Sequence, residues 1–348
     1  LNTYTITKAM IESTVDHGIK SMEEDPKRSM RRLCDLGRQF SKSRCQDYLF
    51  GIIQELLENE DSSYYDLVAN ALKNTDHGTI RDFGVAFGYT SWTYGARMLR
   101  SFEKRTGHAA PLTLMLRFQP DLAGGLSISD IDNIIQQGTA IGIFSYFIRE
   151  VGGSSDSYEI INLFRKYPDC GFAYFRSSGR LTAAQIQMMK LCKNLLTLLP
   201  CEDSETALTA PFLRDNKILF GISALYNSAY STEQVSEALR NVIPSEATFF
   251  IPIADDSVPE SEIQKFTDLC YKSRLEQNYP VFVMDYYGDT AALFGRFLNH
   301  KYLLEIGEDK RIIRPADSSI KVLPTDIPLG DALQKIMPAI DTTDISEK

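Results

Sequence analysis

Two consecutive helix–strand units in the stretch from Leu126 to Leu181 constrain the fold of this chain most. Ser127 or Ser129 can cap a helix whose apolar residues recur at helical spacing, and Gly142 can end it. A short β-rich apolar run follows, and the same order of helix and strand then repeats. Units that alternate in this way predict a parallel sheet with right-handed crossovers, in which ligands bind beyond the carboxyl ends of the strands.

The following part of the chain continues this alternation. Strands are expected at 112–118, 143–148, 171–175, 195–199, 218–225, 248–254 and 281–287. Helices are expected at about 157–167, 182–194, 231–241 and 261–277, and the polar segment 201–216 is expected to be a loop or a short helix. Six or seven βα units in succession predict the α/β class, with a partial or complete barrel rather than an open two-layer sheet.

The predicted elements divide the chain into three regions. Residues 1–108 are predicted to be a mainly helical N-terminal region, 109–298 the barrel, and 299–348 a C-terminal extension with a β-hairpin, a short helix and a tail. The segment around the single tryptophan, Trp92, is predicted to begin extended and to become a helix that ends at Gly107.

The charge balance excludes broad classes of partner. With 37 basic and 46 acidic residues the net charge is −9, whereas general nucleic-acid binding needs basic patches. No apolar run approaches the roughly 20 residues of a membrane helix, and the beginning of the sequence lacks the layout of a signal peptide. The six cysteines are scattered without a CxxC pair, so we expect reduced thiols in a cytoplasmic protein rather than disulfides or a zinc site.

Several local strings, taken together in their order, resemble a known family. They are LSISDIDNIIQQGTAIGIFSYFIREVGG, PDCGFAYFRSSGRLT, ILFGISALYNS, PVFVMDYYGDTAALFGRF and YLLEIGEDKRIIRPADSSI. The chain from about 111 to 335 resembles the radical S-adenosylmethionine family, and more narrowly its members with a C-terminal auxiliary iron–sulfur extension. This resemblance implies a partial (β/α)6 TIM-like barrel with a small C-terminal β-hairpin.

The motifs that define this family's chemistry are missing. The resemblance implies three cysteines, CxxxCxxC, after the first strand, but the loop from Arg117 to Ser127 contains none. The family's Gly-Gly-Glu motif reads Gly152-Gly153-Ser154, so the carboxylate expected to receive the methionine amino group is absent. Arg296 and the Pro315-Ala316 pair stand where auxiliary cysteines would fall. Because thiolates hold iron–sulfur clusters, we expect no cluster and no other metal.

Arginines gather at predicted strand ends or where the family's cysteines would be. They are Arg117, Arg149, Arg176, Arg296 and Arg314. If these side chains converge, they can bind a phosphate, a carboxylate or an acidic peptide, because guanidinium groups pair bidentately with such anions. The alternative is that they pair with acidic residues of the chain, since buried charges are normally compensated. The acidic residues in question are Glu150, Asp156, Asp285, Asp289 and Glu305.

Three other features offer weaker candidates for a site. Asp285 and Asp289 can perform acid–base chemistry, bind a hard metal, or serve as partners for arginine. The turn at 152–155 can hold a phosphate through backbone N–H groups or simply redirect the chain, and Ser178 can touch a ribose or form a turn. The ligand-binding candidates are therefore Arg117, Arg149, Glu150, Gly152, Gly153, Ser154, Arg176, Ser178, Asp285, Asp289, Arg296 and Arg314.

Three functions are compatible with these features. The first is a catalytically degenerate relative that binds a peptide or a protein partner, such as an active paralogue. The second is an enzyme with cluster-independent chemistry on an anionic substrate in the barrel mouth, since loops of this architecture are readily adapted. The third is a binder of S-adenosylmethionine or another nucleotide without turnover. We expect the first, with neither nucleic acid nor membrane as a partner.

Overall fold

The computed structural model describes residues 3–39, 51, 53–152, 158–227, 229 and 232–343 of the chain. The chain forms two compact units, and each contains one part of the strand–helix alternation. The first unit comprises the described residues of 1–81 and 201–289, and the second those of 82–200 and 290–343. No helix in the described ranges is both long enough and apolar enough to span a membrane.

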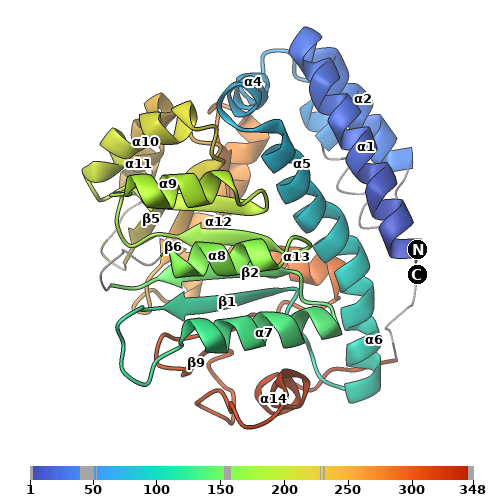
Figure 1. The fold of residues 1–348 in the computed structure, drawn as a ribbon, viewed down its shortest axis with the longest axis vertical. Helices are drawn as coiled ribbons and strands as arrows, with labels where there is room; N and C mark the ends of the chain where they lie inside the picture. The colour runs from blue at the N-terminus through green and yellow to red at the C-terminus, as the bar shows by residue number, and fades with distance from the viewer. Residues whose placement is uncertain are drawn as a thin grey trace. The chain divides into compact units, whose positions relative to one another are not determined.

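The second unit is built on a parallel sheet. Its strands β1 (Thr113–Phe118), β2 (Ser145–Glu150), β3 (Gly171–Phe175) and β4 (Leu195–Pro200) pair in sequence order. The helices α7 (Ile128–Ile141), α8 (Glu159–Lys166) and α9 (Ala183–Lys190) connect successive strands. Figure 1 shows α7 and α8 lying side by side along the same face of β1 and β2. This repeated unit confirms the predicted α/β class and the βα architecture of a partial barrel.

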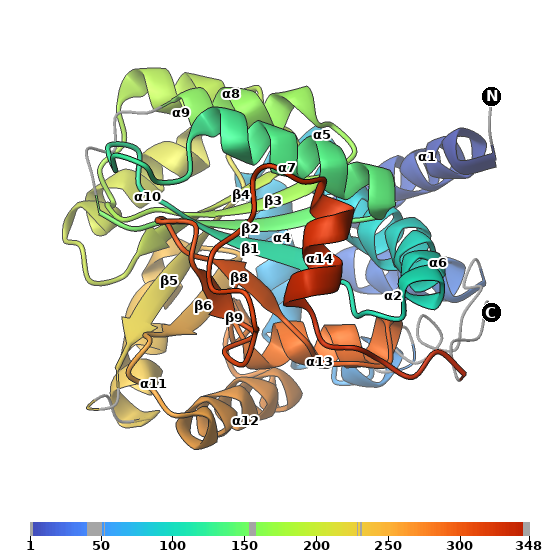
Figure 2. The same ribbon diagram turned by 90° about the horizontal axis from the view of Figure 1, so that it is seen from below.

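The C-terminal hairpin is part of this sheet. Strands β8 (Leu304–Ile306) and β9 (Ile312–Arg314) are antiparallel, and β8 pairs in parallel with β1. The order within the second unit is therefore β4-β3-β2-β1-β8-β9. Figure 2 shows β8 and β9 beside β1, with α14 (Leu329–Ile336) packed near α7. The hairpin thus brings residues from far along the chain next to the first strand.

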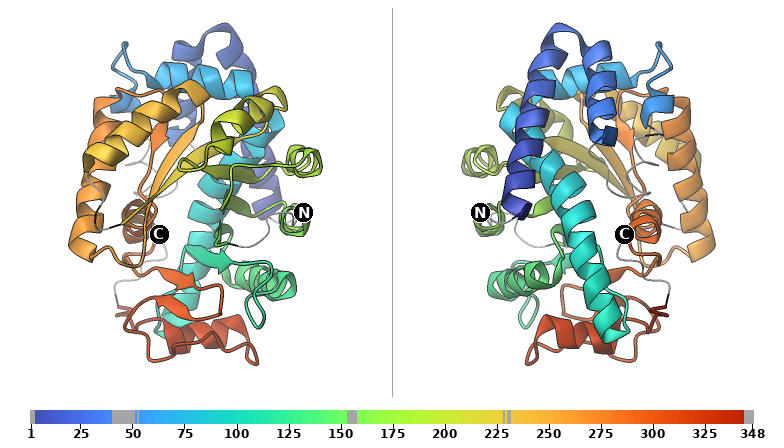
Figure 3. Two further views of the ribbon diagram at one scale, coloured as in Figure 1. Left: turned by 90° about the vertical axis from the view of Figure 1, so that its left-hand side faces the viewer. Right: turned by 90° about the vertical axis from the view of Figure 1, so that its right-hand side faces the viewer.

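The first unit holds the other strands and the N-terminal helices. Strands β5 (Phe220–Tyr226), β6 (Phe249–Ala254) and β7 (Phe282–Val283) pair in parallel. They are accompanied by α10 (Glu205–Asp215), α11 (Thr232–Val242), the 3-10 turn η2 (Ile243–Ser245) and α12 (Glu260–Glu276). The N-terminal helices are α1 (Thr3–Glu24), α2 (Pro26–Gln39) and α4 (Tyr64–Asn74). Figure 3 shows α1 and α2 side by side.

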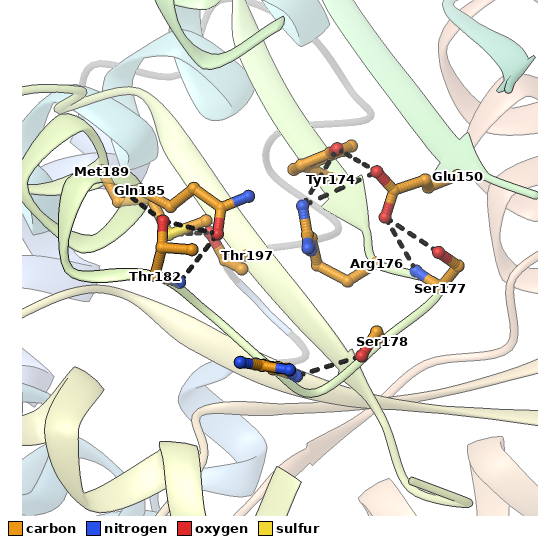
Figure 4. Close-up of polar contacts among 10 residues, drawn as sticks. Glu150, Tyr174, Arg176, Ser177, Ser178, Thr182, Gln185, Met189 and Thr197 are labelled. Carbon is orange, nitrogen blue, oxygen red and sulfur yellow. Dashed lines mark hydrogen bonds and ion pairs between the residues drawn. The ribbon is translucent and has the colours of Figure 1, made fainter. Parts of the chain in front are cut away.

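Local sequence signals fix several helix ends, and those at Ser127 and Gly142 are as predicted. The Ser127 hydroxyl accepts from the backbone N–H of Asp130, whose carboxylate in turn accepts from the backbone of Ser127. Thr182 and Gln185 form the same reciprocal arrangement at the start of α9, as Figure 4 shows. Gly142 ends α7 with a φ of 115°, a conformation that favours glycine. The reciprocal pairs at Ser127–Asp130 and Thr182–Gln185 are capping boxes, which satisfy backbone N–H groups that the first helical turn leaves without partners.

The segment around Trp92 was predicted wrongly in its first half, because it is helical and not extended. The chain runs through α5 (His77–Val85), the π-helix η1 (Ala86–Gly95) and α6 (Ala96–Thr106), which ends at Gly107 as expected. A β-carbon at Gly95 would lie 2.5 Å from the carbonyl oxygen of Gly142, so the two backbones meet where only glycine fits. Tertiary packing therefore overrides the β-type local composition of this segment.

Of the two alternatives predicted for 201–216, a loop or a short helix, the structure has a helix. Residues Glu205–Asp215 form α10, with about three turns, and bury a stripe that includes Ala210 and Leu213. The strand predicted at 281–287 contains only two paired residues. In the mainly helical N-terminal region, α2 ends at Gln39, and residues 40–50 lie outside the described part.

Candidate functional site

The pleat of β2 separates two of the candidate residues. Arg149 is directly opposite Arg117 in the sheet, and Glu150 is directly opposite Phe118. Successive side chains on a strand point to opposite faces, so Arg149 and Glu150 cannot belong to one site on one face. The face of Glu150 is covered by α7 and α8, whereas on the other face Phe147 packs against Phe87 of η1.

On the η1 side of the sheet, three arginines surround one carboxylate. Arg117 donates to Glu305 through Nε at 2.9 Å and through Nη2 at 3.4 Å. The nearest guanidinium nitrogens of Arg149 and Arg314 lie 3.9 Å and 4.0 Å from the Glu305 carboxylate. Glu305 is fully buried, and we call these four residues the Glu305 cluster. Buried carboxylates require such partners, because an uncompensated charge in this environment is costly.

On the α7–α8 side, Glu150 organises a second cluster. Tyr174 donates its hydroxyl to Glu150 Oε1 at 2.9 Å, and Arg176 Nη1 lies 3.6 Å from the same oxygen. The backbone N–H and the hydroxyl of Ser177 donate to Glu150 Oε2 at 3.1 Å and 3.0 Å. Figure 4 shows these groups converging on the carboxylate. Burial, and then the charge of Glu150, raise the pKa of Tyr174. We call this set the Glu150 cluster, and it holds the β3 turn in place.

The remaining strand-end candidates lie apart from these two clusters. Ser178 accepts from the backbone N–H of Arg180 and so stabilises the turn after β3. Gly152 has a φ of 69°, which fits a turn that favours glycine. Arg296 is exposed in the last turn of α13 (Gly288–Phe297) and not at a strand end. The candidates Gly153 and Ser154, and the expected partner Asp156, lie outside the described residues.

In the first unit, Asp289 has an arginine partner that the sequence reasoning missed. Arg274 of α12 binds both carboxylate oxygens of Asp289, at 2.7 Å and 2.6 Å. Asp289 also accepts from the backbone N–H of Asp285 at 2.7 Å. The expected role of Asp289 as a partner for arginine is therefore present, with a residue from a helix instead of a strand end.

Asp285 is fully buried and hydrogen-bonded, and its described contacts include no arginine. It accepts from the hydroxyl of Thr267 at 3.2 Å and from the backbone N–H of Gly288. Desolvation raises the pKa of this carboxyl to about 7, and the nearby charge of Asp289 acts in the same direction. A neutral carboxyl is therefore well populated near physiological pH, which is unusual for aspartate.

The cysteines do not provide ligands for an iron–sulfur cluster in the described ranges. Cys170, Cys192 and Cys270 are buried separately, and burial raises the pKa of each thiol. Within those ranges, no group of three or more Cys, His, Asp or Glu side chains is placed to hold a metal ion. The loop that follows β1 contains no cysteine. Because clusters are held by thiolates, these residues do not fit the group that the resemblance implies.

The fold and the strand-end site define an α/β protein of partial-barrel type. Among solved structures, the chain is similar to SuiB of Streptococcus suis bound to S-adenosylmethionine, with a TM-score of 0.50 and 12% identity. That match covers 67% of this chain and 66% of SuiB, so the chain spans about two thirds of its length. At this identity the match shows a shared partial-barrel α/β fold.

Two further SuiB structures give lower scores. SuiB bound to the precursor peptide SuiA has a TM-score of 0.48 at 14% identity and covers 67% of each chain. The structure described simply as SuiB has a TM-score of 0.47 at 14% identity and covers 66% of each chain. No protein-family model and no curated protein matches the sequence.

Replacing Glu150 tests its structural role. We expect Glu150→Ala to lower the free energy of unfolding by about 3–5 kcal/mol, since it removes the carboxylate beside a fully buried Arg176 side chain. Urea denaturation measures this change. The control Glu262→Ala removes an exposed ion pair with Lys265 and is expected to cost at most about 1 kcal/mol. Equal losses in the two variants would contradict the assigned role of Glu150.

The raised pKa of Asp285 predicts a pH dependence of stability. The folded protein retains a proton on this carboxyl up to about pH 7, whereas an unfolded aspartate loses it near pH 4. The folded state therefore binds more protons between about pH 4 and 7, and the contribution of this group to stability falls as the pH rises through that window.

We expect Asp285→Asn to flatten the decline in stability over this window and to be more stable than the wild type at pH 8. Asparagine keeps an acceptor for Thr267 and Gly288 and carries no charge. The control Asp268→Asn changes an exposed residue of the neighbouring α12 and is expected to retain the wild-type profile. Thermal unfolding across the pH range measures both variants, and an unchanged slope in Asp285→Asn would refute the prediction.

Proposed function

We propose that this protein is a radical S-adenosylmethionine-like protein that functions without an iron–sulfur cluster and binds a peptide or a protein partner, such as an active paralogue. The observation that carries the proposal is the side-chain chemistry after β1. Arg117 is the last residue but one of β1, its guanidinium is hydrogen-bonded to Glu305, and the loop after the strand contains no cysteine. A guanidinium is always protonated and cannot replace a thiolate ligand.

The carboxylates of the site are engaged by side chains of the fold itself. Glu150 accepts three hydrogen bonds from Tyr174 and Ser177, and Glu305 is shared by arginines. These contacts account for the positions of both carboxylates within the fold. The arginine-rich face, in contrast, suits recognition of an anionic group on a partner.

A second candidate function rests on Asp285. A buried carboxyl with a pKa of about 7 near the end of β7 has the acidity that a general acid or base requires. This supports the alternative of an enzyme with cluster-independent chemistry. We favour the binding function, because Asp285 has structural partners in Thr267 and Gly288 that account for its position.

Iron and acid-labile sulfide content tests the proposal after anaerobic purification and reconstitution. We expect a colourless, folded protein with iron and sulfide far below one equivalent, and a visible spectrum without thiolate-to-iron bands. Iron and sulfide in near-stoichiometric amounts would overturn the proposal and show that the cysteines of this chain assemble a cluster site.

A further inference from the structure

We propose that the Glu305 cluster is a binding site for an oxyanion, as carried by a phosphate group or by paired carboxylates of an acidic peptide. This inference deepens the proposed function, because it names the chemistry by which a partner would be recognised. It concerns residues of the second unit alone, and it rests on the placement, pairing and accessibility of three arginine side chains.

The sheet places the four residues on one face. Arg117 and Arg149 are Cα partners across β1 and β2. Glu305 of β8 is opposite Met115, two residues before Arg117 and thus on the same face of β1. Arg314 of β9 is opposite Glu305. Three guanidinium groups from three strands therefore converge on one carboxylate.

The single carboxylate does not satisfy the three arginines equally. Arg117 donates to both carboxylate oxygens of Glu305, through hydrogen bonds of 2.9 Å and 3.4 Å. Arg149 is only 8% exposed, and its closest approach to Glu305, 3.9 Å, exceeds hydrogen-bond distance. Within the described residues Arg149 Nε has no hydrogen-bond partner. A buried guanidinium in this state is costly unless a ligand supplies acceptors.

The hydrogen-bond donors and the access route indicate the class of ligand. Arg149 makes no hydrogen bond to Glu305, and its Nε has no acceptor among the described residues, so a ligand at this place would supply oxygen acceptors of its own. The Arg314 side chain is 28% exposed, against 8% and 10% for Arg117 and Arg149, so a ligand would enter beside Arg314. The planar fork of arginine matches the paired oxygens of phosphates and carboxylates.

Calorimetric titration tests the site with three small probes at matched ionic strength: inorganic phosphate, glutarate and acetate. We expect saturable one-to-one binding of phosphate, glutarate or both, and much weaker binding of acetate. Arg149→Met is expected to weaken binding by roughly tenfold to a hundredfold, the loss of a charged hydrogen-bond pair. The control Arg311→Gln removes an exposed charge from the same hairpin and is expected to leave the affinity within about twofold.

The outcomes separate the sources of the anion. Saturation by phosphate alone supports a phosphate-bearing ligand, and saturation by glutarate supports paired carboxylates of a peptide. Absence of saturable binding to either probe, or equal losses in Arg149→Met and Arg311→Gln, would overturn the inference.

The unfolding temperature of Arg149→Met shows whether a loss of anion binding in this variant comes from a loss of folding. In buffer without these anions, Arg149→Met is expected to unfold at a temperature no lower than the wild type, because it removes an incompletely paired buried charge. A large drop would instead assign Arg149 a purely structural role and would overturn the inference.

The failure of this inference and the failure of the proposed function can be told apart. If the protein is free of iron but binds no anion, only the inference fails and the proposed cluster-free function stands. If a cluster can be reconstituted, the proposed function is refuted, whatever the anion titration shows.

Discussion

The buried carboxylate of Glu305 is the interaction on which the strand-end site depends. It lies on β8, and it is held against β1 by the backbone pairing that joins the C-terminal hairpin to the sheet. Without it, Arg117 and Arg149 would be two adjacent like charges in a region shielded from water. The carboxylate satisfies Arg117 directly and Arg149 only at a distance. In the cluster around Glu150, by contrast, the carboxylate accepts from Tyr174 and Ser177 and Arg176 lies 3.6 Å away, so its carboxylate is held mainly by neutral donors.

Much of the fold follows from local sequence signals, because those signals act over a few residues. The capping pairs at Ser127 and Thr182 begin their helices, and Gly142 ends α7, as physical rules for helix ends require. The π-helix η1 could not be predicted in this way. Its path depends on the close approach of Gly95 to Gly142, a contact between distant segments that composition does not encode. The pattern of α10 does not decide between loop and helix, because its apolar residues do not mark one face: Leu208 and Phe212 are exposed, whereas Ala210 and Leu213 are buried.

The candidate site was predictable in its residue types but not in its grouping. The sequence identifies the arginines near strand ends. That Arg149 and Glu150 lie on opposite faces can also be derived from sequence, because side chains of a strand alternate between the two faces. The pairing of β8 with β1, which brings Glu305 and Arg314 to Arg117, is non-local and needed the structure. The Arg274–Asp289 pair likewise depends on how α12 packs beside β7.

The most direct test of the central claim is to observe the arginine Nε–H groups by heteronuclear NMR during titration with phosphate and with glutarate. The resonance of Arg149, assigned by its loss in Arg149→Lys, is predicted to shift with saturation and to become protected from exchange with water. Arg176, on the opposite face, is predicted to remain unchanged. A titration in which exposed arginines such as Arg311 shift while Arg149 does not would contradict an oxyanion site in the Glu305 cluster.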